Sequence, residues 1–467
     1  MDKQLVSAAH GYRLHSLERH WQSWPPGHSL RQARVERYDP INGLFHSPTE
    51  YYYLPIESVV PLRPSDVDIG QLFQEFVRGE FGSKKKSRGD CPPDLMAQAS
   101  ENISYRTLLR YLEVCERQLV WSGLAGGIVK GTKRDMVAQL GELLSSPLLG
   151  NKENAKLSSS EWSAILQPLV SQQHRICFIV PGFPFKDQNP FRTAAHAGHA
   201  DLGEIALLIR LHVLTMASFQ VHPFGVDWLI VSDGHAYAPI LRVDEHHVNE
   251  YQRQLRLYRD LLNIYGSVGI LELKDLCAHL GRDAAGEPIF DVTNRYISAR
   301  LRELTERCSE IAMSFATLVR GVKWNLNFRD IAKEYAVDRL TYWLLLNSDG
   351  STARGKSWEK LWRLFDDLAR EAALAYASFN LAIRCHKLFE SLFPQSVRAT
   401  THAKKGQIAV PALGDVTPWN GVAFVRGSEL SATSVAVEPL YRLARYGSIT
   451  PKVIRSGEPP LYYQTEP

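Results

Sequence analysis

Residues 174–234, HRICFIVPGFPFKDQNPFRTAAHAGHADLGEIALLIRLHVLTMASFQVHPFGVDWLIVSDG, decide the fold class of this chain. Ile176–Val180 is an unbroken apolar run of strand length, and Pro181-Gly182 ends it. Apolar residues then recur at helical spacing over Asp201–Ser218, and a second strand-like run follows at Asp227–Val231. This alternation predicts an α/β fold, with a Rossmann-like, mainly parallel sheet flanked by helices.

The same pattern places the expected site. Asp244 is a candidate cap for a further helix that runs to Tyr265. Open α/β sheets bind ligands beyond the carboxyl ends of their strands. We therefore expect functional groups in the loop after Val180 and in the turn Ser232–Gly234.

The rest of the chain divides by composition. Predicted helices at Tyr105–Trp121 and Lys133–Leu144 suggest a small helical unit, the segment 298–389 is mostly helical, and 422–426 can form a strand. The predicted division is an irregular N-terminal extension at 1–95, the small helical unit at 96–150, the α/β domain at 151–430 and a C-terminal tail at 431–467.

Composition excludes several classes of protein. The 467 residues carry 54 Lys and Arg against 50 Asp and Glu, and a formal charge of +4 is too small to imply nucleic-acid binding. No apolar stretch approaches the length of a membrane span, and the N-terminus lacks the apolar core of a signal peptide. Six scattered cysteines without a CxxC pair are typical of reduced thiols. We expect a cytoplasmic protein with no nucleic-acid or membrane partner.

The loop Gly182–Glu204 holds the densest group of polar side chains. Lys186 and Arg192 can bind a phosphate or a carboxylate, Lys as a point charge and Arg through its fork. Asp201 can cap the following helix, and Glu204 completes an acidic capping box, so a structural role competes with a catalytic one for both carboxylates.

Two other motifs allow different readings. His199-Ala200-Asp201 has the His-x-Asp spacing of non-haem iron dioxygenases, but the strand–helix alternation argues against their jelly-roll fold. Residues 350–357, GSTARGKS, fit the P-loop pattern, with Lys356 as its lysine. The segment before it has helical spacing, whereas a P-loop follows a strand, so we expect an interhelical turn there. Dinucleotide, hydrolase-elbow and zinc-protease motifs are absent from the sequence.

A third cluster lies at 393–420, FPQSVRATTHAKKGQIAVPALGDVTPWN. Arg398, His402, Lys404 and Lys405 concentrate positive charge and one imidazole, and Trp419 sits in a rigid turn. This combination is compatible with an anion site, or with a solvated basic loop.

Taken in order, GFPFKDQNPFRTAAHAGHADLGE, WLIVSDGHAYAPIL and SVRATTHAKKGQIAV with TPWN resemble the isocyanide (isonitrile) synthases, the pyoverdine/dityrosine biosynthesis family. The resemblance spans about residues 175–425. The chain departs from the family pattern at Ala200, Arg192 and Thr400–Ala403. It also ends the TPWH motif in Asn420, so it lacks an imidazole there.

The resemblance implies condensation of the α-amine of tyrosine or tryptophan with ribulose 5-phosphate, whose ketone carbon becomes the isocyanide carbon. It implies no metal or redox cofactor, and a downstream Fe(II)/2-oxoglutarate dioxygenase as a possible pathway partner. Residues expected in proton transfer or amine binding are Asp201, Glu204, Asp233 and His402. Residues expected to bind substrate are Phe185, Lys186, Asn189, Arg192, Arg398, Lys405 and Trp419.

Four alternatives remain open from the sequence. A relative of these synthases could release an N-formyl or otherwise altered amine, which the change to Asn420 motivates. An iron dioxygenase would use His199 and Asp201, and a P-loop protein would need Lys356. A binding protein on the same fold would bind the ligands without turnover.

Overall fold

A computed structural model describes most of residues 135–433, together with 37–39, 44–46, 68–81, 101–102, 449–453 and 462–465. Between 135 and 433 it leaves out 275–294 and short gaps, of which 194–198, 402 and 404–405 concern the predicted site. The predicted helix Tyr105–Trp121 lies outside the described residues.

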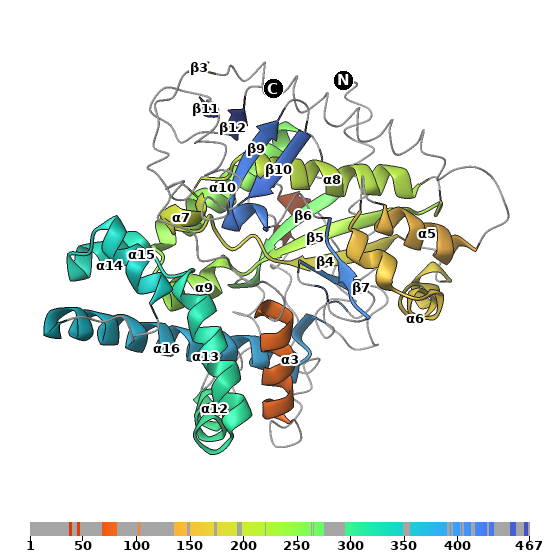
Figure 1. The fold of residues 1–467 in the computed structure, drawn as a ribbon. Helices are drawn as coiled ribbons and strands as arrows, with labels where there is room; N and C mark the ends of the chain where they lie inside the picture. Colours follow the sequence, from red (N-terminus) through yellow and green to blue (C-terminus); the bar gives the residue numbers. More distant parts are fainter. Residues whose placement is uncertain are drawn as a thin grey trace.

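The centre of the fold is a five-stranded, wholly parallel sheet in the order β6-β5-β4-β7-β8 (Figure 1). Its strands are β4 (Ile176–Pro181), β5 (Val226–Ser232), β6 (Val268–Glu272), β7 (Ser396–Thr400) and β8 (Ile408–Ala409). The predicted α/β class is confirmed, because β4 and β5 pair directly with Ile176 opposite Val226 and Pro181 opposite Val231. Strand β5 is buried along its whole length, as both-sided burial of a parallel sheet requires.

Helices cover both faces of this sheet (Figure 1). Helix α8 (Leu202–Ser218) packs on β5, with α10 (Glu245–Leu261) against it, and α9 (Gly234–Leu241) precedes α10. Across the sheet lie α3 (Ile69–Phe81), α12 (Arg295–Arg307), α13 (Ser309–Lys323) and α16 (Lys356–Cys385), packed on one another. Asp244 caps α10 as predicted, but the helix ends at Leu261 rather than Tyr265.

The strand order identifies where a ligand would bind. β4 and β7 are neighbours, yet the chain leaves β4 toward β5 and leaves β7 toward β8. Such a reversal is a topological switch point, and open α/β sheets bind ligands outside the carboxyl ends of the strands at that point. The loop after β4 and the segment after β7 both lead away from it.

A second sheet, in the order β10-β9-β12-β11-β3, lies beyond α8 (Figure 1). Its strands are β3 (Glu101–Asn102), β9 (Val422–Arg426), β10 (Glu429–Thr433), β11 (Ile449–Val453) and β12 (Tyr462–Thr465). The strand predicted at 422–426 is therefore confirmed. Strands β9 and β10 contact α8, and the short helix η4 (Pro418–Asn420) joins them there.

The remaining elements complete the surroundings of the sheet. α5 (Met136–Ser145) corresponds to the predicted helix Lys133–Leu144 and packs on α6 (Ser159–Val170) and α8. The other short elements are β1 (Arg37–Asp39), β2 (Leu44–His46), η3 (Lys152–Lys156) and α7 (Pro190–Thr193). The division of the chain at residues 95, 150 and 430 stays a prediction.

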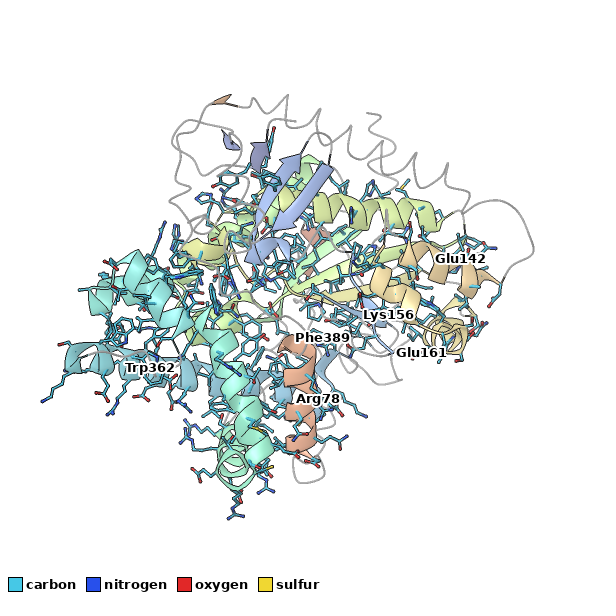
Figure 2. All side chains as sticks on the ribbon, viewed as in Figure 1. Arg78, Glu142, Lys156, Glu161, Trp362 and Phe389 are labelled. Atoms are coloured by element: carbon cyan, nitrogen blue, oxygen red, sulfur yellow. The ribbon has the colours of Figure 1, made fainter. Side chains whose placement is uncertain are left out.

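The P-loop-like motif follows helices, as expected. The segment before it forms α14 (Phe328–Tyr335) and α15 (Arg339–Asn347), and Lys356 begins α16. A helix cannot deliver the loop to a phosphate as the strand of a P-loop does. Helix α16, which begins at this motif, packs on α13: the Lys323 ammonium of α13 lies 5.1 Å from the ring centroid of Trp362, which is labelled in Figure 2. Among the described helices, none is long and apolar enough to cross a bilayer.

Candidate active site

The loop after β4 begins with a strained backbone. Phe183 has a φ of 57°, a left-handed conformation that is uncommon for a residue other than glycine. Its carbonyl oxygen accepts hydrogen bonds from the Ser232 hydroxyl (3.1 Å) and the Gln252 amide (2.7 Å), and its ring packs on Trp419 at 4.7 Å between centroids. Strained residues of this kind persist only where the surroundings hold them, and they cluster at functional sites.

Gly234 lets helix α9 approach this loop. A Cβ atom built on Gly234 would lie 2.0 Å from the carbonyl oxygen of Pro184, a backbone atom that cannot move aside alone. The first turn of α9 and the loop after β4 are therefore in direct contact across the carboxyl ends of β4 and β5. This contact is possible only because position 234 has no side chain.

Gly234→Ala is expected to destabilise the protein by about 2–3 kcal/mol, because the loop must shift to relieve the overlap. Urea denaturation measures the change in the free energy of unfolding. Gly355→Ala is the control: its Cβ would meet nothing within 4 Å, and only its φ of 93° opposes the change, at about 1 kcal/mol. Equal effects of the two substitutions would contradict the close approach.

The centre of the site is a buried cluster of one lysine and two carboxylates. The Lys186 Nζ lies 2.9 Å from Asp201 Oδ2 and 3.0 Å from both carboxylate oxygens of Glu204. It also donates to the carbonyl oxygen of Pro418 at 2.9 Å. Tyr251 donates to Glu204 Oε1 at 3.2 Å. The exposed fraction is at most 1% for Lys186, Asp201, Glu204 and Tyr251, so protein atoms alone surround these ionisable groups.

The start of α8 holds both carboxylates in place. Asp201 is the N-cap and accepts from the Gly203 N–H at 2.8 Å, while Glu204 accepts from the Asp201 N–H at 2.9 Å. The capping box predicted from the sequence is therefore present. The second oxygen of Asp201 accepts from the Ala423 N–H of β9 at 3.0 Å, which ties the second sheet to the cluster.

Burial and mutual charge shift the ionisation of the cluster. The pKa of Glu204 is raised to about 8, because burial and, to a smaller extent, the charge of Asp201 raise it by more than Lys186 lowers it. Burial alone lowers the pKa of Lys186, but the two carboxylates outweigh it and the net shift is upward. Burial and Glu204 raise the pKa of Tyr251. The cluster thus holds a positive lysine, and Glu204 can exchange a proton near neutral pH.

Arg192 belongs to a neighbouring group at the carboxyl end of α13. Its Nη1 donates to Asp187 Oδ2 at 2.8 Å and to Asn325 Oδ1, and the guanidinium carbon lies 5.9 Å from the Trp324 ring centroid. Asn189 donates to the Trp324 carbonyl oxygen at 2.8 Å. The Arg192 side chain is 13% exposed, in contrast to Lys186. The loop therefore carries one fully enclosed cation and one that reaches the surface.

Two further predicted residues lie on the sheet itself. Asp233 occupies the N-cap position of α9 directly after β5, and its side chain makes no capping hydrogen bond. Arg398 lies in the middle of β7 opposite Ile179, with its guanidinium carbon 5.1 Å from the Phe389 ring centroid. Asp233 therefore lies at the edge of the sheet where ligands are expected to bind. Arg398 lies within a strand, away from that edge.

The predicted aromatic residues are packed inside the protein. Phe185 is 4% exposed and Trp419 is 7% exposed, and Trp419 fills the space above Gly182 and Phe183. The Asn420 amide donates to the Thr417 hydroxyl at 2.9 Å. The TPWN turn therefore helps to close the site, since the Trp419 carbonyl oxygen also accepts from the Asp187 N–H at 2.8 Å.

The structure does not describe His402 and Lys405, and their roles stay predictions. For the iron alternative, both Asp201 oxygens already accept protein hydrogen bonds, from Gly203 on one side and from Ala423 and Lys186 on the other. Over the described ranges, which leave out His196 and His402, no group of three metal-binding side chains is found. The arrangement does not favour His199 and Asp201 as iron ligands.

Sequence reasoning missed the part of the site contributed by α10. Tyr251 and Gln252 are both fully buried and bind Glu204 and Phe183, respectively. Polar residues beside Val248 and Leu255 on a predicted buried helix face are a signal that could have pointed to them.

The geometry defines a class of protein before any comparison. A parallel α/β sheet with a switch point, a strained loop and a charged cluster beyond the strand ends is the architecture of a small-molecule-binding α/β enzyme. The comparisons narrow this class. The family described as pyoverdine/dityrosine biosynthesis protein matches residues 166–438, more than half of the chain, and the chain belongs to that family. The resemblance stated from the sequence is confirmed.

Two related proteins are similar to this chain. The L-tyrosine isonitrile synthase of Xenorhabdus nematophila is 27% identical over 266 residues, which cover 55% of this chain and 70% of that protein. The crystal structure of the PvcA protein from Pseudomonas aeruginosa shares 16% sequence identity with a TM-score of 0.49, over 71% of this chain and all of that one.

Proposed function

We propose that this protein is an isonitrile synthase that converts the α-amine of an aromatic amino acid into an isocyanide, with ribulose 5-phosphate as the carbon donor. The observation that carries the proposal is the similarity to L-tyrosine isonitrile synthase, within a family whose matched segment contains Lys186, Asp201, Glu204, Tyr251 and Pro418. The buried charged cluster supports it, because the reaction requires several proton transfers.

The proton transfers set requirements that the cluster can meet. The substrate ammonium must lose a proton before its nitrogen attacks the ketone, and the resulting carbinolamine must lose water to form an imine. A carboxyl with a pKa of about 8 takes up and releases protons near neutral pH. We assign this exchange to Glu204, which is fully buried and would therefore act through its hydrogen-bond partners Lys186 and Tyr251 rather than by touching the substrate. Asp233 and His402 are further candidates.

A phosphate-binding cation must have N–H donors that are not already bound by protein oxygens. An ammonium has three N–H donors, and protein oxygens from Asp201, Glu204 and Pro418 surround that of Lys186. Arg192 has five donors and reaches the surface. We therefore propose that Arg192 and Lys405 bind the phosphate. Lys186 has a holding role: its ammonium keeps the Asp201 and Glu204 carboxylates in place.

Incubation of the purified protein with tyrosine or tryptophan and ribulose 5-phosphate labelled with ¹³C at the ketone carbon tests the proposal. We expect an amino acid product that carries the label as an isocyanide, seen by mass spectrometry and ¹³C NMR. A formamide product is heavier by one water and would replace the isocyanide assignment with the N-formyl alternative. Binding of both compounds without a labelled product would contradict an enzymatic role.

A further inference from the structure

Gln254 of α10 makes three hydrogen bonds that together fix the orientation of its amide. Its Oε1 accepts from the Ala200 N–H at 2.9 Å. Its Nε2 donates to Glu250 Oε1 at 2.8 Å and lies 2.9 Å from His199 Nδ1. Gln254 is 8% exposed. A backbone N–H can only donate and a carboxylate can only accept, so the amide cannot be turned over.

This orientation determines the tautomer of His199. Because Gln254 presents an N–H to Nδ1, that ring nitrogen must be the acceptor and carries no proton. The proton of the imidazole is then on Nε2, and the ring is neutral. The hydrogen bond that one ring nitrogen makes thus sets the state of the other.

The surroundings of His199 place it beside the charged cluster. It stands two residues before Asp201, and Gln254 follows Tyr251 by one turn of the same helix. The charged and titratable groups around it are Glu250 and His247 of α10, with Arg329 of α14 beside His247. Arg253 pairs with Glu250 at 2.6 Å, which offsets the attraction of that carboxylate for a charged imidazole.

We propose that Gln254 is a positioning residue that holds His199 as the neutral Nε2–H tautomer, and that this N–H donates a hydrogen bond to the ketone oxygen of the sugar phosphate. The second half of this proposal rests on the proposed function. A neutral imidazole is suited to the task, because it polarises a carbonyl group without giving up its proton to the substrate amine. Helix α10 would then support both Glu204, through Tyr251, and His199, through Gln254.

A charge-conserving exchange tests the first half. In the double variant Glu250→Gln/Gln254→Glu, the carboxylate at 254 can still accept from the Ala200 N–H, but it can only accept from His199. We expect ¹H–¹⁵N NMR at pH 8.5 to show the proton of His199 on Nε2 in the wild type and on Nδ1 in the exchange variant. Glu250→Gln alone is the control and should keep the Nε2–H form. The signal is assigned by its loss in His199→Gln.

Activity tests the second half. Relative to Glu250→Gln, the exchange variant should lose about 100-fold in kcat/KM for the sugar phosphate, the usual effect of removing one oxyanion donor. His199→Phe should lose a similar factor, and His199→Gln should recover part of it through its amide N–H. Asn249→Asp, the same chemical change on the exposed side of α10, should leave kcat/KM unchanged.

The two halves fail differently. A wild-type His199 with its proton on Nδ1, or an exchange variant with an unchanged NMR signature, would overturn the role of Gln254. An active wild type whose His199→Phe variant is equally active would overturn the role of His199. A wild type that makes no labelled product would overturn the proposed function and the substrate contact, while the NMR result would still decide the role of Gln254.

Discussion

Lys186→Met is expected to lower the free energy of unfolding by about 3–5 kcal/mol, as removal of one partner from a buried ion pair does. Methionine fills a similar volume but leaves Asp201 and Glu204 facing each other without a countercharge, in a site where both are at most 1% exposed. The Pro418 carbonyl oxygen would also lose its donor. Chemical denaturation with urea measures the loss.

Lys156→Met is the matched control for this prediction. Lys156, the last residue of η3 and labelled in Figure 2, pairs with Glu153 at 2.5 Å, but its side chain is 74% exposed. Exposed pairs contribute about 0–1 kcal/mol, so little change is expected. If Lys186 instead served only to bind phosphate, Lys186→Met would keep wild-type stability and lose affinity for ribulose 5-phosphate. That result would contradict the holding role assigned to it.

The elements that sequence predicts well are those whose signal is local. The runs at Ile176–Val180 and Asp227–Val231 are apolar over the length of a strand, and both are strands of the sheet. The capping box of Asp201 and Glu204 depends on a three-residue spacing and is present. The helical reading of the segment before Lys356 is correct as well, although Ala336, with a φ of 52°, divides it into two helices.

Contacts between distant segments could not be derived in the same way. Nothing in the local sequence around Lys186 shows that its ammonium meets Pro418, 232 residues away, or that Tyr251 completes the cluster. A lysine in a polar loop is expected to be exposed to solvent. Lys186 is completely buried because β9 and η4 pack over the start of α8. Phe185 and Trp419 are predicted from the sequence to contact the substrate. Both are buried, so packing in the core alone accounts for their presence, and substrate contact stays a prediction.

Glu204→Gln is expected to abolish the part of the fall in folding stability between about pH 4.5 and 8 that is due to Glu204. It should also lower kcat/KM by about 10²–10⁴-fold, the usual contribution of an acid–base group. Burial raises the pKa of Glu204 to about 8 in the folded protein, from its ordinary value of 4.5. Folding therefore binds a proton at Glu204 between these values, so the contribution of Glu204 to stability is fully present below about pH 4.5 and is lost as pH rises through 8. The slope is at most about 1.4 kcal/mol per pH unit.

Two other glutamates, Glu272 and Glu161, serve as comparisons for this prediction. Burial would raise the pKa of Glu272, but His235 and Arg256 lower it to about 2, so its stabilisation is lost only below about pH 4.5. Glu272 is therefore ionised throughout pH 5 to 8, but burial lowers the pKa of His247 and His386, which also titrate in this range. The difference between the wild-type and Glu204→Gln curves from pH 5 to 8 isolates Glu204, because the histidines contribute equally to both. Glu161, labelled in Figure 2, closes the capping box of α6 with Ser158 in the same way at the surface, and Glu161→Gln should keep the wild-type decline and activity. Glutamine satisfies a capping box as glutamate does, so a difference between the two variants reports the buried charge rather than the helix start. A Glu204→Gln protein that declines in stability like the wild type would show that Glu204 is already ionised at pH 5.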